Sequence, residues 1–204
     1  MLTAGMMRSL DVSDITIAAW IYPTNWEHTT YPGIVVKRTT YPTLDWELYY
    51  DATSDRILFL VEGGDNPLFH SLNLNPALNQ WHFLTVTKEG TNYSLYHNGV
   101  YQGSETGSST LPTGDKLVIG ALQAGGGDPF KGTIDEVRIS ATARSGDWIK
   151  TSYNNQNNPL TFYTVGAQQD AGPVPPVPDL PAIILFGAGL LVIVYAVARG
   201  CSRR

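Results

Sequence analysis

Apolar and polar residues alternate in short runs along the first 165 residues of the chain. In the run 44–50 every second residue is apolar, so one face of an extended backbone is apolar and the other carries Asp45 and Glu47. Similar runs, separated by turn-forming residues, lie at 15–23, 33–38, 56–63, 80–89, 91–104, 116–121 and 130–140. Many short strands without intervening helices predict an all-β fold, an antiparallel sandwich or barrel.

Local motifs add a turn, a helix and a last strand to this pattern. Asn98-Gly99 joins two strand-like runs and favours a type I′ hairpin turn, whose central residues both take positive φ. One helix is predicted after the last long strand, because Ser145 can cap its first turn and Ile149 begins an apolar face. The run 161–166 is predicted to return to the sheet as a final strand.

Two adjacent acids lie in the middle of the run 130–140. Strict alternation places Glu136 on the same face as Arg138, and Asp135 on the same face as the apolar Val137. Glu136 and Arg138 are then expected to form an ion pair on the solvent side. Asp135 on an apolar face needs hydrogen-bond donors or a cation.

The C-terminal part of the chain has a different composition. A Pro-rich stretch at 169–179 predicts a stiff, extended spacer, and 180–198 contains no charged residue. About 19 helical residues at about 1.5 Å each span about 28 Å, which is enough to cross the hydrocarbon layer of a membrane. We therefore expect a transmembrane helix at 180–198 and a basic tail at 199–204. The expected anchor includes Leu180, Pro181, Arg199, Arg203 and Arg204.

Charge narrows the range of partners. The net charge is −5, and because three arginines lie in the last six residues, the domain before them is more acidic than the total. Contacts to nucleic-acid phosphates need clustered cations, so no nucleic-acid partner is expected. The single cysteine, Cys201, allows no intrachain disulfide.

The arginines after the span predict a cytoplasmic C-terminus and an extracellular sandwich, in a single-pass protein of the cell membrane. The first 14 residues contain no apolar stretch behind a basic start, so they do not form a signal peptide. Either the domain stays inside as part of a tail-anchored protein, or the chain lacks its true beginning. We expect the second.

Four stretches carry a resemblance to a known family: 10–26, 81–100, 116–121 and 130–166. Together they resemble the laminin G-like, concanavalin A-like jelly-roll domains of archaeal and bacterial surface proteins, and the stretch 130–166 is the most specific. The resemblance implies a jelly-roll domain over 1–168 with two curved antiparallel sheets. The tail 177–204 resembles the sorting tails of such proteins. The family pattern opens with another strand, which none of the residues before Leu10 is expected to form.

The resemblance also implies candidate sites. In related jelly rolls the matching Asp helps to hold a structural Ca²⁺ together with backbone carbonyls, so Asp135 is a candidate ligand for one Ca²⁺. Hydrogen bonding of Asp135 to loop amides is the alternative. Trp26, Tyr31 and Tyr41 fall in predicted loops, where aromatic rings either stack on sugars or cover the rim of the core.

Three functions remain open. The family implies a non-catalytic binding or adhesion module that contacts glycans or envelope proteins. A structural envelope or coat component without a soluble ligand is the alternative. A glycoside hydrolase needs paired carboxylates, for which Asp45, Glu47 and Asp51 are candidates. The Glu-x-Asp-x-x-Glu strand of jelly-roll glucanases is not present, so we expect no catalytic residue and no enzyme.

Overall fold

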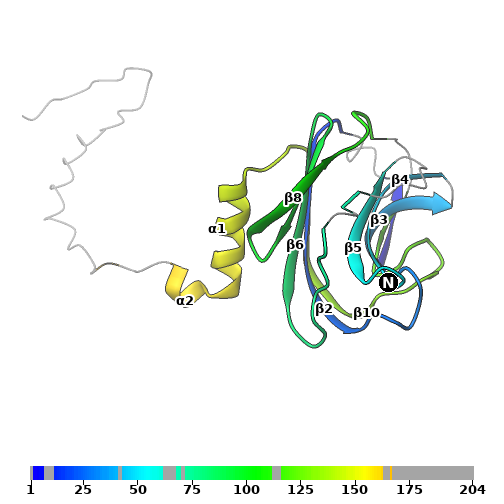
Figure 1. Ribbon diagram of the computed structural model, residues 1–204, viewed down its shortest axis with the longest axis horizontal. Helices are drawn as coiled ribbons and strands as arrows, with labels where there is room; N and C mark the ends of the chain where they lie inside the picture. Colours follow the sequence, from blue (N-terminus) through cyan, green and yellow to red (C-terminus); the bar gives the residue numbers. More distant parts are fainter. Residues whose placement is uncertain are drawn as a thin grey trace, which may run out of the picture. The chain divides into compact units, whose positions relative to one another are not determined.

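Two five-stranded antiparallel sheets face each other in the computed structural model (Figure 1). The structure describes residues 2–6, 12–40, 43–61, 68–69, 72–111, 116–162 and 166. Sheet 1 has the order β1 (Leu2–Met6), β9 (Lys116–Ile119), β3 (Gly33–Thr40), β4 (Thr43–Asp51), β5 (Arg56–Val61). Sheet 2 has the order β10 (Lys131–Ser140), β2 (Ile15–Asn25), β6 (His82–Glu89), β7 (Asn92–His97), β8 (Val100–Thr106). The predicted antiparallel sandwich is confirmed.

The core lies between the two sheets and follows the period-two pattern of the sequence. In β4 the apolar set Trp46, Leu48 and Tyr50 is buried in this core, as alternation predicts. Sheet 2 contributes the buried side chains Ile15, Ile17, Ala19, Ile21, Leu84, Val86, Tyr93 and Leu95. Burial of this apolar area is the main contribution to the stability of the sandwich.

The predicted helix is also present. Helix α1 (Gly146–Asn157) begins after Ser145, whose side chain accepts a hydrogen bond from the backbone N–H of Trp148 at 3.3 Å. The helix lies on the outer face of sheet 2 (Figure 1), where Ile149 is fully buried against Ala18 and Phe83.

The hairpin turn between β7 and β8 adopts the predicted conformation and lies against this helix. Asn98 and Gly99 both have positive φ, 51° and 75°. A Cβ atom on Gly99 would lie 3.1 Å from Tyr153 of α1, so the glycine also permits the close approach of the helix.

Two predictions about strands are wrong. Residues Leu2–Met6 do form a strand, β1, which pairs with β9 at the edge of sheet 1. Thr161 and Phe162 lie in the short helix α2 (Pro159–Phe162) rather than in a final strand. Pro159 lies two residues before the predicted strand and favours the helix instead, because its fixed φ suits the first residue of a helix.

The predicted spacer, membrane span and basic tail lie outside the described residues. This includes Leu180, Pro181, Arg199, Arg203 and Arg204. Within the part of the chain that the structure describes, no helix combines the length and the apolar character needed to cross a membrane.

Candidate functional site

A β-bulge in β10 explains the two adjacent acids. Asp135 pairs with Trp20 and Arg138 pairs with Ala18, so two residues of β10 lie opposite a single residue of β2. Glu136 is in the bulge and has a φ of 49°, which is rare for a residue with a side chain. The extra residue resets the alternation, and the strand no longer follows a strict period of two.

Because of the bulge, Asp135 does not share a face of the strand with Val137, and this prediction is wrong. Val137 and Ile139 pack against the core, whereas Asp135 is exposed and lies with Glu136 and Arg138 on the outer side of sheet 2. The backbone N–H of Glu136 donates to Asp135 Oδ1 at 2.8 Å. Glu136 and Arg138 form the expected ion pair, with their side chains 48% and 43% exposed. Both acids therefore face solvent, and neither carries the free-energy cost of a buried charge.

The surroundings of Asp135 can be compared with the ligands that the predicted calcium ion needs. Ca²⁺ takes six to eight oxygen ligands, but Asp135 is the only carboxylate of the bulge that is not paired with Arg138. Among the described residues, no three His, Cys, Asp or Glu side chains come together as a metal site. The described side chains around Asp135 therefore do not fit a calcium site, and binding that relies on backbone carbonyls stays a prediction.

The outer face of sheet 2 contains a hollow of about 470 Å³ beside this bulge. Its aromatic wall is formed by Trp20 and Trp81, whose rings meet edge to face at 6.4 Å. Trp20 is buried beneath α1, where its ring stacks on Tyr153 at 5.6 Å. Trp81 is 45% exposed and is also in contact with Tyr22, at 5.5 Å. The hollow therefore offers one accessible indole ring, that of Trp81, which packs against Trp20 and Tyr22.

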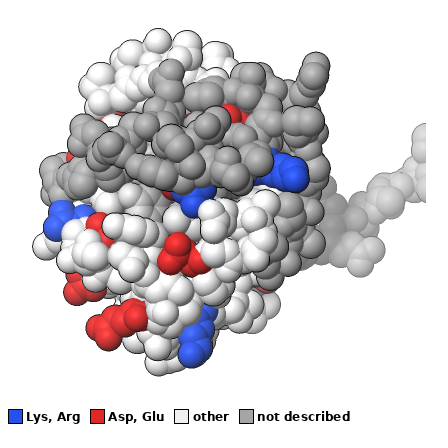
Figure 2. Space-filling view, turned by 90° about the vertical axis from the view of Figure 1, so that its right-hand side faces the viewer, with Lys and Arg blue, Asp and Glu red and all other residues white. Residues whose placement is uncertain are grey.

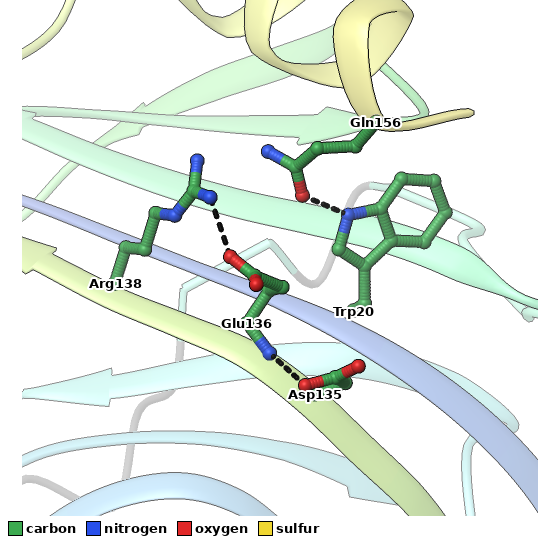
Figure 3. Close-up of polar contacts among 5 residues, drawn as sticks. All are labelled: Trp20, Asp135, Glu136, Arg138 and Gln156. Carbon is green, nitrogen blue, oxygen red and sulfur yellow. Dashed lines mark hydrogen bonds and ion pairs between the residues drawn. The ribbon is translucent and has the colours of Figure 1, made fainter. Parts of the chain in front are cut away.

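The opposite walls of the hollow are polar. Asp135, Glu136 and Arg138 line it from β10, and the last turn of α1 contributes the amide side chains of Asn155 and Asn157. Gln156 lies between these two, and its Oε1 accepts a hydrogen bond from Trp20 Nε1 at 2.5 Å. Figure 3 shows Glu136, Arg138 and Gln156 reaching toward the same space from β10 and α1. The hollow thus combines an aromatic surface with many hydrogen-bonding groups.

The structure does not bring the sequence-predicted aromatic residues together at such a site. Trp26 is only 5% exposed, stacks on Tyr50 at 4.0 Å and donates from Nε1 to the carbonyl of Pro76. Tyr31 is 40% exposed and contacts Tyr49 edge to face at 6.0 Å. Tyr41 lies outside the described residues. Burial of Trp26 favours the alternative in which it covers the rim of the core.

A second hollow, of about 460 Å³, lies near Trp26 and Tyr50. Their rings stack on each other, and Trp26 and Tyr50 are only 5% and 1% exposed, so neither presents an accessible face. Tyr50 Oη lies 2.5 Å from Asp55 Oδ1 and 3.1 Å from Asn75 Oδ1, so its single proton is already engaged by these acceptors. This hollow therefore offers less accessible aromatic surface than the one beside Trp81.

The acids of β4 are in a third environment. Asp45 forms an ion pair with Lys37, and Glu47 lies 2.6 Å from Arg38 Nη1; all four residues are buried. Burial raises the pKa of Glu47 to about 7, although the charge of Arg38 acts in the opposite direction. Asp45 and Glu47 are only 1% and 2% exposed in this structure.

The surface of the domain is of mixed charge. On the face in Figure 2 the acidic and basic side chains of the described residues are scattered among uncharged ones. No basic patch gathers on the part of this face that the structure describes.

The sequence signals for the hollow were weaker than those for the core. Trp81 lies one residue before β6, at the edge of a run that was predicted to be a strand. The amide-rich end of α1 and the paired acids of β10 are 20 residues apart along the chain. The bulge brings these groups together, and a bulge in β10 has no clear signal in this sequence.

Comparison with known proteins is consistent with this architecture. The family model of the concanavalin A-like lectin/glucanases superfamily matches residues 2–150. No curated protein sequence matches the chain.

Solved structures of the same fold include the heptameric SAP-like pentraxin of Limulus polyphemus, with 17% identity over 75% of this chain and 73% of that chain, and a TM-score of 0.55. Domain 4 of the extracellular arabinanase AbnA of Geobacillus stearothermophilus, in complex with arabinotriose, has 17% identity over 68% and 65% of the two chains, and a TM-score of 0.52. The Trypanosoma rangeli sialidase has 14% identity over 76% of this chain, and a TM-score of 0.58.

The chain spans 65% of the arabinanase domain and 26% of the sialidase. At these identities the three structures establish the fold alone, whereas the family model covers most of the chain. The chain therefore belongs to the concanavalin A-like lectin/glucanases superfamily.

Proposed function

We propose that the protein is a non-catalytic glycan-binding module of a cell surface, and that the hollow beside Trp81 is its binding site. The single observation that carries this proposal is the exposed Trp81 ring over a hollow with polar walls. A flat aromatic face packs against the apolar face of a sugar ring. The side chains of Asp135, Asn155 and Asn157 can then exchange hydrogen bonds with its hydroxyl groups.

The site is also held in place before any ligand binds. Trp20 is fixed by Phe83 at 5.2 Å, by Tyr153 and by its hydrogen bond to Gln156. A preformed site loses less conformational entropy on binding, which favours affinity. The uncharged stretch 180–198 supports the proposed attachment to the membrane, and the arginines after it support the proposed position of the module outside the cell.

A glycan array tests this function. The full chain is applied in a detergent without a sugar headgroup, together with the variants Trp81→Ala and Tyr31→Ala. Trp81 and Tyr31 are both exposed aromatic residues, but Tyr31 does not line the hollow. We expect Trp81→Ala to lose at least about tenfold in affinity for the best ligand, and Tyr31→Ala to bind as the wild type does.

Two results would contradict the proposal. The first is that no polysaccharide or oligosaccharide binds to the wild-type chain. The second is that bound glycans are cleaved, which an assay for newly released reducing ends detects. Equal binding by the wild type and Trp81→Ala would place the glycan elsewhere on the domain.

A further inference from the structure

We infer that the hollow beside Trp81 selects neutral glycans and discriminates against anionic ones such as uronates. This inference rests on the proposed function and adds the class of glycan. The inference follows from three features. These are the net charge of the residues that line the hollow, the ion pair of Arg138 with Glu136, and the partial negative charge at the C-terminal end of α1.

The charged side chains that line the hollow carry a net charge of −1. Asp135 and Glu136 are acidic, and Arg138 is the only cation among the lining residues that the structure describes. Arg138 is paired with Glu136, so its guanidinium is already engaged by a carboxylate. A sugar carboxylate that approaches the hollow therefore meets the uncompensated charge of Asp135.

The end of α1 adds to this polarity. The last turn of the helix lines the hollow with Asn155, Gln156 and Asn157, and it contains no basic residue. The C-terminal end of a helix carries a partial negative charge from carbonyl groups without intrahelical partners. No lysine or arginine of the last turn offsets this partial charge, and it adds to the repulsion of an anion.

The same groups suit a neutral sugar. Its hydroxyl groups can donate hydrogen bonds to the carboxylates of Asp135 and Glu136, and bonds to an ionised acceptor are stronger than those between neutral groups. The amide groups of Asn155 and Asn157 both donate and accept, so they can bind pairs of adjacent hydroxyls. The ring of Trp81 adds contact area that does not depend on charge.

Matched glycan pairs test this selectivity in the full chain. Each pair has one backbone in two charge states: cello-oligosaccharides with and without oxidation at C6, and oligogalacturonate with and without methyl esterification. We expect the neutral member of each bound pair to bind about three- to sixfold more tightly for one uncompensated charge at about 4–7 Å. Raising the salt from about 0.1 M to about 1 M should strengthen only the anionic member, because salt screens the repulsion.

Charge variants of the bulge sharpen the test. The double variant Asp135→Asn/Glu136→Gln leaves Arg138 unpaired and changes the charge of the lining residues from −1 to +1. The measured quantity is the ratio of neutral to anionic affinity, and we expect this ratio to invert in the double variant. Both changed side chains are exposed, and circular dichroism and the melting temperature check that the fold is retained.

The outcomes separate this inference from the proposed function. If the wild-type chain binds glycans but binds uronates as tightly as their neutral partners, or more tightly, the inference is overturned and the function stands. An unchanged affinity ratio in the double variant also overturns it. If no member of any pair or of the glycan array binds, the proposed function fails, and the inference fails with it.

Discussion

Two ion pairs, one in each sheet, use the same kinds of side chain in opposite environments. On sheet 2 the Glu136–Arg138 pair is nearly half exposed and borders a hollow that opens to solvent. On sheet 1 the Lys37–Asp45 pair is buried, with only 1% and 2% of the side chains exposed. An exposed ion pair contributes little to stability, whereas a buried pair becomes costly when one partner is lost.

This difference separates the charges available for binding from those that affect the fold. Exposed groups around the bulge can change without loss of the domain, so selection for a ligand can act on them. The buried groups of β3 and β4 are constrained by each other. The effect of changing an ionisable side chain in this domain is thus expected to depend on its burial. The measurements below test this expectation.

The largest effect is expected from the buried pair. Lys37→Met removes the cation of this pair from beside the buried Asp45 carboxylate, and we expect a loss of about 3–5 kcal/mol in the free energy of unfolding. Urea denaturation of the full chain measures this loss. The double variant Lys37→Met/Asp45→Leu should recover most of it, because neither charge of this pair is then left buried alone.

The exposed pair is the matched control for this experiment. Arg138→Met breaks a pair of the same type on sheet 2, and we expect a change of less than about 1 kcal/mol. Equal losses in Lys37→Met and Arg138→Met would contradict the distinction between the buried pair and the exposed pair.

The next effect concerns pH. Burial raises the pKa of Glu47 from 4.5 to about 7. The folded state therefore holds the proton more tightly than the unfolded state, and Glu47 favours folding below about pH 4.5 and loses this contribution as the pH rises through 7. Glu47→Gln removes this dependence, so its stability relative to the wild type should rise by about 3 kcal/mol between these pH values. A constant difference across this range would contradict the assignment.

For His97 we expect the opposite change of stability with pH. Burial and the neighbouring His82, whose Nδ1 is 2.9 Å from His97 Nε2, lower the pKa of His97 from 6.5 to about 4. Its contribution to stability is present above pH 6.5 and is lost as the pH falls toward 4. His97→Gln should therefore lose stability relative to the wild type as the pH rises from 4 to 6.5, which is the reverse of the trend for Glu47→Gln.

A smaller effect is expected where α1 meets the hollow. Gln156→Ala leaves Trp20 Nε1 without its hydrogen-bond acceptor, and we expect a loss of about 1 kcal/mol in the free energy of unfolding. Asn155→Ala, at an exposed position in the same turn, should change it by less than about 0.5 kcal/mol. Thermal unfolding followed by circular dichroism measures the stability of both variants. If Gln156→Ala is as stable as the wild type, this hydrogen bond does not hold the helix on the sheet.

The sequence predicted the fold well where local pattern and tertiary burial agree. Alternation in 44–50 placed Trp46 and Leu48 in the core, and Asn98-Gly99 formed its turn, because each of these signals is local. The last predicted strand, 161–166, is wrong at Thr161 and Phe162, because a helix begins at Pro159 just before it. The strand Leu2–Met6 was missed because its pairing with β9 joins residues more than 100 positions apart.

The candidate site was less predictable than the fold. A single inserted residue at Glu136 reverses the side on which Asp135 lies, and period-two reasoning does not detect such an insertion. Loop position made Trp26 look accessible, but its ring stacks inside on Tyr50. Trp81 was predicted to be part of a strand, but it lies one residue before β6, with its ring against Trp20 and Tyr22 and 45% of the residue exposed.

A crystal structure of the protein with its tightest neutral oligosaccharide tests the central claim most directly. We predict a sugar ring stacked on Trp81, with hydroxyl groups hydrogen-bonded to Asp135 and to the amide groups at the end of α1. A sugar bound instead in the hollow beside Trp26 and Tyr50, or on the outer face of sheet 1, would contradict the account.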